Sequence, residues 1–488
     1  MKEKREKILT NVFVSAGGNK LQLCDIYYAD TIQSVVPKID YKFDWNELKD
    51  DFQREKLMGR FSSLKREGCS VIDGKFLLAI PGAIDPHVHF NTPGFEFRDT
   101  FQKGSLAAAY GGVTTVIDMP CTSIPPVTNL DNFKIKSDAV KNKSCVDYAF
   151  WGGVPGNDFN QIIAEKNITE LADAGVAGFK VYTISGMDTF KDLNYNEMEI
   201  IAKSINRTGK PLAVHAEDKE IISQNRHKIK DEDLNRWESY CMMRTVEAEV
   251  KAVTNLINIA ERTGCRFHIV HLSSKAALGL IKNAQKKGLN ISTETCPHYL
   301  YFTQDSFNNK SIRNYLKTAP PVKFESDRDE LWQGLAEGTI AFVATDHAGC
   351  DPAKEKSSDN FSEVYGGIPG VEHRVSFLFS EGFLKGRLNL EQTINLLSSN
   401  TADYFHLKEK GYLKAGYDAD IALINLWSSQ IVSGLNMHSK GKYTPFEGIT
   451  FNAVVEKTFL RGNIITDKSS NGTEPDLENK YLGKLICV

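Results

Sequence analysis

The run Ala83-Ile-Asp85-Pro-His87-Val-His89-Phe90 decides the fold of this chain. It is a short stretch typical of a β-strand, and it carries two histidines that stand two residues apart near its end. On an extended strand, side chains at i and i+2 point to the same side, so both imidazoles can reach one metal ion. Taken alone the pair is a weak signal, because two hydrogen-bonded core histidines give the same pattern.

The middle of the chain repeats this element. Short β-rich runs alternate with amphipathic helical segments, such as residues 245–262 and 275–287. Eight strand–helix units over about 270 residues predict an α/β fold, a (β/α)8 TIM barrel of the metal-dependent hydrolase type. The predicted strands are Ala83–Phe90, Thr114–Met119, Asp147–Gly152, Gly178–Tyr182, Leu212–Ala216, Phe267–Leu272, Ile291–Thr295 and Phe342–Thr345.

The two ends of the chain differ from its middle. Residues 1–80 and 409–488 contain strand-like pieces, which predict one small flanking β-sandwich domain built from both ends. The barrel would then occupy residues 81–408. Residues 39–68 are dense in charge and read as a helical insertion, which is more often a solvated surface element than a functional one.

The composition excludes several classes of protein. Of 488 residues 41% are apolar and 25% charged, and the net charge of -3 favours neither nucleic acid nor a membrane as partner. No apolar run approaches the roughly 18 residues of a membrane span. Met1–Lys7 lacks the apolar core of a secretory signal, and the nine scattered cysteines form no CxxC pair. We therefore expect reduced thiols and a cytoplasmic location.

Side chains that can bind metal stand at the ends of five predicted strands. In (β/α)8 barrels the active site lies at the carboxyl ends of the strands, so these side chains should converge. Singly, each would more often be structural, but their joint placement predicts a two-metal hydrolytic site. Nitrogen and carboxylate ligands suit zinc, although iron, manganese and cobalt use similar sets. The set is His87, His89, Lys180, His215, His271 and Asp346.

Lys180 is the unusual member of this set. A buried ammonium is costly, so desolvation lowers its pKa and leaves a nucleophilic amine. Such an amine can take up CO2 as a carbamate, which is an anionic oxygen ligand able to bridge two metal ions. A salt bridge with a nearby carboxylate is the alternative, and residue types alone do not choose between the two.

A series of short motifs follows in order along the chain: Pro81–His89, Gly111–Thr115, Met119-Pro120, Gly178–Lys180, Val214–Glu217, His271–Ser274, Glu294–Tyr299, Pro320-Pro321, Thr345–His347 and Gly416–Asp420. Over roughly residues 70–468 the chain resembles the cyclic amidohydrolases of the amidohydrolase superfamily. These are the dihydroorotases, the allantoinases and the dihydropyrimidinases or hydantoinases.

The resemblance implies two divalent metal ions and a hydrolytic mechanism. His87, His89 and Asp346 would bind the more buried ion, and His215 and His271 the second. Carbamylated Lys180 would bridge both ions. A bridging hydroxide would attack the ring carbonyl, while Asp346 accepts its proton and delivers one to the leaving amide nitrogen. The implied substrate contacts are Asn91, His298 and Ala319.

The subfamily patterns point to different rings. Dihydroorotases usually carry Arg at the position of Asn91 and Asn at that of Cys121, groups that hold the substrate carboxylate. Their absence argues against dihydroorotate, although Pro93–Phe97 resembles dihydroorotases. Hydantoinases usually carry an oxyanion-donating Tyr at the position of Ser185. The stretch Ser185–Phe190 resembles allantoinases, whereas Val375–Gly382 is closer to hydantoinases. We expect an allantoinase-like enzyme, with dihydropyrimidinase or hydantoinase and then dihydroorotase as alternatives.

A catalytically inactive scaffold homologue is the alternative outside enzymes. Relatives of that kind have lost metal ligands, whereas every ligand position is filled here. The expected partner is a small cyclic amide, and the family implies a homo-oligomer, a dimer or tetramer. Two nearby residues have other expected roles: packing for His347, and for Arg244 either pairing with a carboxylate near the barrel mouth or holding the loop.

Overall fold

The computed structural model describes residues 6–61, 69–468 and 481–488. The end of the charged segment, residues 62–68, lies outside the described residues. Residues 1–5 and 469–480, which belong to the predicted flanking domain, also lie outside them.

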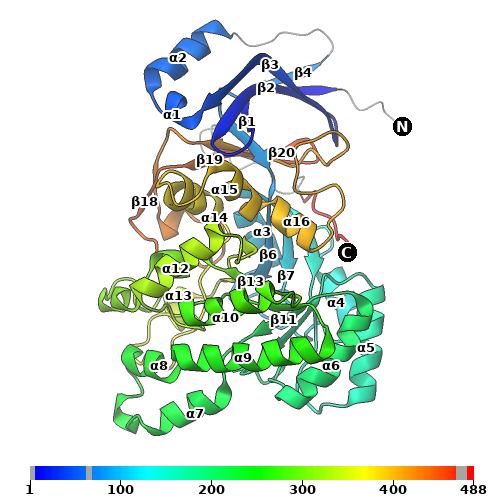
Figure 1. Ribbon diagram of the computed structural model, residues 1–488, viewed down its shortest axis with the longest axis vertical. Coiled ribbons are helices and arrows are strands. Elements are labelled where there is room, and N and C mark those ends of the chain that lie inside the picture. The colour runs from blue at the N-terminus through cyan, green and yellow to red at the C-terminus, as the bar shows by residue number, and fades with distance from the viewer. Residues whose placement is uncertain (1–5, 62–68, 469–480) are drawn as a thin grey trace.

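Parallel strands close into a barrel, which confirms the predicted fold class (Figure 1). Two arcs, β15-β6-β7-β8 and β9-β10-β11-β12-β13-β14, make it up, and β15 pairs in parallel with β6. β8 and β9 are successive pieces of the third barrel strand, and β14 and β15 of the eighth. The strands are β6 (Ala83–His89), β7 (Val113–Asp118), β8 (Asp147–Phe150), β9 (Gly152–Gly153), β10 (Phe179–Tyr182), β11 (Leu212–His215), β12 (Phe267–Ile269), β13 (Ile291–Thr295), β14 (Phe342–Val343) and β15 (His347–Ala348).

Helices surround the strands, and the predicted segments 245–262 and 275–287 are α9 and α10. In α9 the N-cap Thr245 accepts a hydrogen bond from the Ala248 amide, and Gly264 ends the helix at a φ of 67°. The main helices are α3 (Phe101–Tyr110), α4 (Leu130–Val140), α5 (Gln161–Asp173), α6 (Tyr195–Thr208), α7 (Lys219–His227), α8 (Trp237–Met243), α9 (Val246–Thr263), α10 (Lys275–Lys286), α12 (Glu325–Ala336), α15 (Leu390–Leu397) and α16 (Ser399–Tyr404).

Both flanks of the chain contribute to one mixed sheet above the barrel (Figure 1). Its order is β20-β19-β16-β5-β1-β2-β3, with β4 beside β1. The central pair joins the flanks, because Ile80 of β5 lies opposite Ala422 of β16 in an antiparallel ladder. The strands are β1 (Lys7–Ser15), β2 (Lys20–Tyr28), β3 (Ile32–Asp44), β4 (Ser70–Asp73), β5 (Leu78–Pro81), β16 (Ile421–Asn425), β19 (Val454–Leu460) and β20 (Asn463–Asp467).

The charged segment is only partly helical. Its first residues, 39–44, continue β3, which pairs with β2 as far as Lys20 opposite Asp44. Ile39, Tyr41 and Phe43 alternate with charged residues, and this period of two overrides the charge density that suggested a helix. The helices α1 (Trp45–Leu48) and α2 (Asp51–Arg60) follow, and α1 starts at a capping box formed by Asp44 with Glu47.

A buried ionic cluster joins the barrel to the mixed sheet. The Lys410 ammonium lies 2.7 Å from a carboxylate oxygen of each of Asp147, Asp418 and Asp420. Asp147 begins the barrel strand β8, and Asp420 directly precedes β16. The three carboxylates lie close enough together to hold a cation, and the Lys410 ammonium already supplies that charge.

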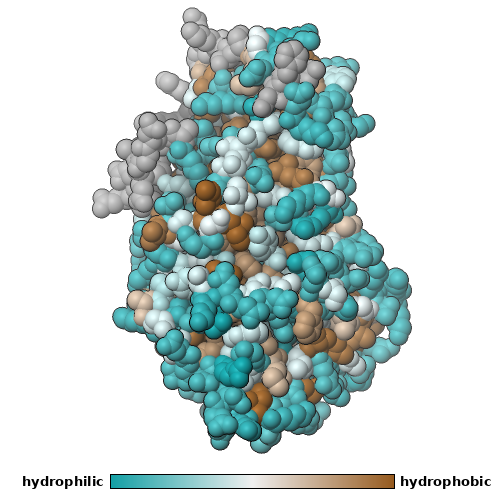
Figure 2. Space-filling model, turned by 90° about the vertical axis from the view of Figure 1, so that its left-hand side faces the viewer, coloured by the Kyte–Doolittle hydropathy of each residue, from teal (hydrophilic) through white to brown (hydrophobic). Residues whose placement is uncertain are grey.

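The surface is mainly polar on the face seen in Figure 2. Among the described residues of this face, apolar side chains gather in small separate groups between hydrophilic ones. Among the described residues, no helix combines the length and the apolar character that crossing a membrane requires.

Candidate functional site

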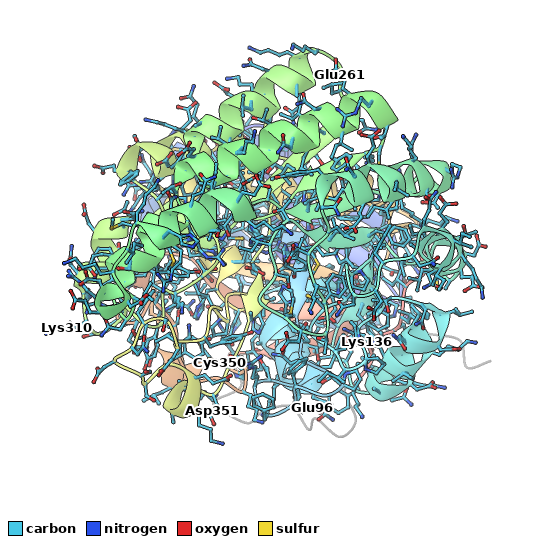
Figure 3. The ribbon with its side chains drawn as sticks, turned by 90° about the horizontal axis from the view of Figure 1, so that it is seen from below. Glu96, Lys136, Glu261, Lys310, Cys350 and Asp351 are labelled. Atoms are coloured by element: carbon cyan, nitrogen blue, oxygen red, sulfur yellow. The ribbon has the colours of Figure 1, made fainter. Side chains whose placement is uncertain are left out.

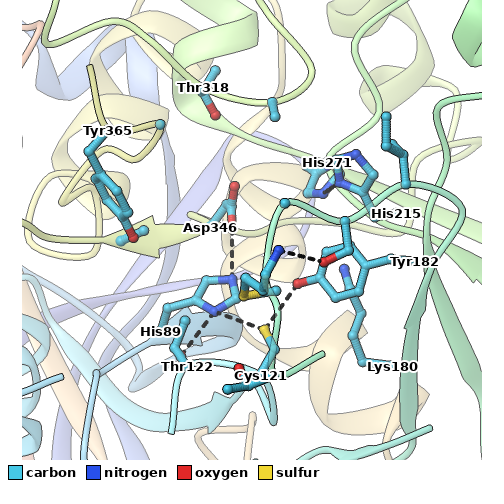
Figure 4. A pocket seen from close by; sticks show the side chains of 18 of the residues that line it. His89, Cys121, Thr122, Lys180, Tyr182, His215, His271, Thr318, Asp346 and Tyr365 are labelled. Atoms are coloured by element: carbon cyan, nitrogen blue, oxygen red, sulfur yellow. Dashed lines mark hydrogen bonds and ion pairs between the residues drawn. The ribbon is translucent and has the colours of Figure 1, made fainter. Parts of the chain in front are cut away.

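The six predicted ligand residues line one pocket at the carboxyl ends of the barrel strands (Figure 4). The cavity measures about 480 Å³. Loops after β6 and β15 form part of its rim, and Figure 3 shows Glu96, Cys350 and Asp351 on the same side of the barrel. An ion pair between Arg98 and Glu355, at 2.7 Å, ties these two loops together.

Three of the six residues form a first ligand group. The Nε2 atoms of His87 and His89 lie 3.2 and 3.1 Å from the same Asp346 oxygen. Burial alone would raise the pKa of the Asp346 carboxyl, but the two imidazoles outweigh it and hold the pKa well below its usual value. The three donor atoms all lie within 4.8 Å of one another, close enough to ligate one ion.

Partners on the far side of each ring orient this group. Glu294 of β13 contacts His87 Nδ1 and lies 3.2 Å from His268 Nε2, and Thr122 Oγ1 lies 3.2 Å from His89 Nδ1. These contacts leave both Nε2 atoms aimed at Asp346. Carboxylate partners of this kind fix the orientation of metal-ligating histidines.

His215 and His271 form a second group. His215 Nδ1 faces His271 Nε2 at 3.1 Å, and the other His215 nitrogen lies 2.9 Å from Glu217. Burial lowers the pKa of both imidazoles, so both are neutral near pH 7. His271 Nδ1 has no hydrogen-bond partner in the described part of the chain. Two neutral imidazole nitrogens facing each other are a ready donor pair for a cation.

Lys180 rises from β10 into the same pocket (Figure 4). Its side chain is fully buried, and its Nζ has no hydrogen-bond partner among the described residues. Burial lowers the pKa of the amine to about 8, although Cys121 and Asp346 act in the opposite direction. No carboxylate pairs with the amine at salt-bridge distance in the described part, so the salt-bridge alternative is not supported.

The backbone at the pocket departs from strand geometry. His271 and Asp346 have φ values of 39° and 50°, in the left-handed region that non-glycine residues rarely adopt. Asp346 therefore interrupts the eighth strand, and the predicted run to Thr345 ends earlier, at Val343. Such conformations cost about 1–3 kcal/mol each and cluster at functional sites.

The three expected substrate contacts differ in position. Ala319 lines the pocket. Asn91 is fully buried, and its amide donates to the Gly349 carbonyl at 3.4 Å. His298 is buried against the Tyr299 ring, and burial lowers its pKa to about 4. Neither Asn91 nor His298 is among the residues that line the pocket.

His347 and Arg244 have the roles that the sequence suggested. His347 Nε2 lies 3.3 Å from Asp99, and its Nδ1 accepts the Val371 amide at 3.2 Å, so it packs away from the ligands. Arg244 pairs with Glu217 beside the second group.

Several functional side chains were not predicted. Glu217 stands two residues after His215, and the same-face rule for strands could have found it. Glu294 was noticed only as part of a motif. Tyr182 and Tyr365 line the pocket, but no sequence signal separated them from core aromatic residues.

Comparison with known proteins decides the family. A sequence model of the amidohydrolase family matches residues 78–465, most of the chain. The chain belongs to the amidohydrolase family. Within this family it is 35% identical to an allantoinase of Rubrobacter xylanophilus, over 81% of this chain and 85% of that protein. It is 34% identical to an allantoinase of Enterococcus faecalis, over 83% and 90% of the two chains.

One solved structure matches the whole fold. The L-hydantoinase (dihydropyrimidinase) of Arthrobacter aurescens superimposes with a TM-score of 0.86 at 27% identity, covering 99% of this chain and 100% of that one. The resemblance to cyclic amidohydrolases found in the motifs is therefore confirmed.

Proposed function

We propose that this protein is a hydrolase that opens the ring of an uncharged cyclic amide, in the manner of an allantoinase. The observation that carries the proposal is the convergence of four histidines, a buried lysine and an aspartate in one pocket. The allantoinase and hydantoinase relatives support the same reaction class, hydrolysis of a carbon–nitrogen bond in a small ring.

Two divalent metal ions fit the donor set, and we propose zinc. The first group offers two imidazoles and a carboxylate, and the second offers two neutral imidazoles. Lys180 Nζ and His271 Nδ1 have no hydrogen-bond partner among the described residues, as is expected of side chains around something the protein does not contain. When bound, such ions lower the pKa of water and polarise the ring carbonyl.

Lys180 is proposed to carry a carbamate. The amine is buried, lacks a partner in the described part and has a pKa of about 8, so much of it is neutral near pH 8. A neutral amine adds to CO2 and releases one proton to solvent, and the product is a carbamate anion that stands among the imidazole nitrogens of the pocket. Native mass spectrometry of the wild-type protein and of Lys180→Met would test for the added CO2.

Asp346 is proposed to move the proton. Its carboxylate lines the pocket as part of the first ligand group and is held ionised by His87 and His89. An ionised carboxylate can take a proton from the attacking water and pass it to the leaving ring nitrogen. The ring then opens without release of a strongly basic amide anion.

The charges around the pocket favour a neutral ring. Arg98 is paired with Glu355 and Arg244 with Glu217, so both guanidinium groups among the described lining residues are already neutralised. A substrate carboxylate would therefore find no unpaired arginine guanidinium among the described residues that line the pocket. This favours allantoin, hydantoin or dihydrouracil over dihydroorotate and leaves dihydropyrimidinase or hydantoinase activity as the second candidate.

We also propose a location and an assembly for this protein. All nine cysteines are described and none forms a disulfide, which supports a reducing, cytoplasmic location. A homo-oligomer, a dimer or tetramer, is proposed from the family resemblance, and light scattering would test it.

The proposed function is tested by incubating the zinc-loaded protein in bicarbonate buffer with each of four compounds and measuring ring opening. The compounds are allantoin, hydantoin, dihydrouracil and dihydroorotate. Turnover of allantoin, hydantoin or dihydrouracil is expected. Turnover of dihydroorotate alone would contradict the charge argument. A protein that binds two metal ions per chain and opens none of the rings would contradict the proposed substrate class.

A further inference from the structure

Tyr182 stands on the same side of β10 as Lys180, because the two residues are two positions apart on one strand. Its ring stacks on His215, with centroids 5.5 Å apart at 29°, and meets Phe190 edge-on at 5.7 Å. The ring is therefore fixed on the second ligand group, and its hydroxyl points into the pocket (Figure 4).

The contact of this hydroxyl is unusual. It lies 3.0 Å from the sulfur of Cys121, and that sulfur lies 3.8 Å from His89 Nδ1. Cys121 comes from the loop after β7, so the pair connects the two ligand groups across the pocket. Either group can be the donor in this contact. A thiol is only a weak hydrogen-bond partner, so the phenolic hydroxyl can turn its proton toward a stronger acceptor.

Ser185 does not offer a comparable donor. Its hydroxyl donates to the Phe190 carbonyl at 2.7 Å and accepts the Met187 amide at 3.1 Å. Both bonds stay within its own loop, and a substrate would have to break them. The Tyr182 hydroxyl exchanges only a thiol contact for a substrate oxygen.

We propose that the Tyr182 hydroxyl is a catalytic hydrogen-bond donor to the oxygen of the ring carbonyl under attack, and that Cys121 positions it. This inference rests on the proposed function. The carbonyl oxygen gains negative charge as water adds, so a donor aimed at it is stronger in the transition state than in the bound substrate. The effect should therefore appear in kcat more than in KM.

Tyr182→Phe separates this role from packing. Phenylalanine keeps the ring contacts with His215 and Phe190 and removes only the hydroxyl. The expected result is a fall in kcat of about 10²-fold with KM within a few-fold, as for loss of one oxyanion donor. The metal content and the thermal unfolding midpoint should stay at wild-type values.

Cys121→Ala tests the positioning role. Alone it should lower kcat by less than Tyr182→Phe does, and added to Tyr182→Phe it should have little further effect, because both act through one hydroxyl. Tyr195→Phe is the matched control, since it removes a hydroxyl bonded to Asp218 at 2.9 Å outside the pocket, and it should leave kcat unchanged.

The outcomes separate this inference from the proposed function. If the wild-type protein opens a ring and Tyr182→Phe does so at the same kcat, the inference is wrong while the proposed function stands. Loss of metal or of folding in Tyr182→Phe would assign the residue a structural role and also overturn the inference. A wild-type protein that opens no ring would overturn both.

Discussion

Glu294 shows how single residues prepare the pocket. Its carboxylate is buried and touches two imidazoles, His87 and His268. Burial alone would raise its pKa, but the two rings lower it to about 2. It therefore stays ionised at every pH at which the protein would work, and it fixes the direction of the His87 ring.

Glu294→Gln should weaken metal binding by about 10–100-fold, because the amide holds the His87 ring less firmly than a carboxylate does. Dialysis against graded concentrations of chelator, followed by metal analysis, would measure this. Glu363→Gln, on an exposed residue bonded to Ser358, is the control. An unchanged metal affinity in Glu294→Gln would show that the ring is oriented by other contacts.

Asp346→Asn should keep the fold and lower kcat by about 10²–10⁴-fold, because the amide cannot accept the proton of water. Circular dichroism and steady-state kinetics on the ring that the wild-type protein opens would measure the two effects. Near-wild-type turnover would refute the proposed role of Asp346.

At this scale the sequence predicts ligands better than their surroundings. His87 and His89 were predicted because residue type and strand spacing act locally. Glu294 contacts a histidine more than 200 positions away, and no local pattern encodes that pairing. The Tyr182–Cys121 contact is of the same kind, since it depends on β7 and β10 standing on either side of the third barrel strand.

Among the elements, the segment from Asp351 to Gly367 is held by buried lysines. The Lys356 amine donates to the carbonyls of Asn314 and Tyr365, at 3.0 and 2.7 Å. Tyr365 lines the pocket, so Lys356 fixes one wall of it. Burial lowers the pKa of Lys356 to about 7; Lys317 acts in the same direction, and Cys350 and Glu355 oppose it.

This shift predicts a pH dependence of stability. Between about pH 7 and pH 10.5 the unfolded chain binds the Lys356 proton and the folded chain does not, so the free energy of unfolding rises with pH. Between pH 7 and pH 9 the free energy of unfolding of the wild-type protein, relative to that of Lys356→Met, should rise by about 1–3 kcal/mol, measured by urea unfolding. Lys354→Met, on an exposed side chain of the same segment, should show no such trend. If the free energies of unfolding of the wild-type protein and Lys356→Met differ by the same amount at pH 7 and pH 9, the lowered pKa of Lys356 is contradicted.

The sequence predicted the bounds of elements whose apolar periodicity is strong. It missed the bounds that depend on the backbone conformation of a single residue. β13 has the predicted bounds, Ile291–Thr295. The eighth strand ends early because Asp346 adopts a positive φ, which a residue-type pattern does not reveal. Residues 39–44 were assigned to a helical segment because their charge density obscured an alternation of period two.

Over the whole molecule, the cluster around Lys410 connects the barrel and the mixed sheet. Lys410 is almost fully buried, and burial would lower its pKa, but three carboxylates raise it instead. Arg461, directly after β19, contacts Asp147 as well. The sequence predicted that both flanks build one domain, but not this cluster, because its members are brought together only by the closed sheet.

Lys410→Met should lower the free energy of unfolding by about 3–5 kcal/mol, because it leaves Asp418 and Asp420 without a cation and Asp147 with Arg461 alone. Denaturant unfolding would measure this, with the exposed Lys408→Met as the control.

The Asp418→Asn variant should bind as much zinc as the wild-type protein does. A loss of bound zinc in that variant would show that the cluster holds a metal ion.

The order of strands in the mixed sheet also determines when each strand can pair during protein synthesis. β5 ends at Pro81 and its partner β16 begins at Ile421, 340 positions later. At roughly 5–20 residues per second, a ribosome needs about 20–70 s to make the intervening chain. During that interval β1, β2 and β3 can pair with one another, while one edge of β5 waits for a partner. The barrel segment is therefore synthesised before the mixed sheet can be completed by the pairing of β16 with β5.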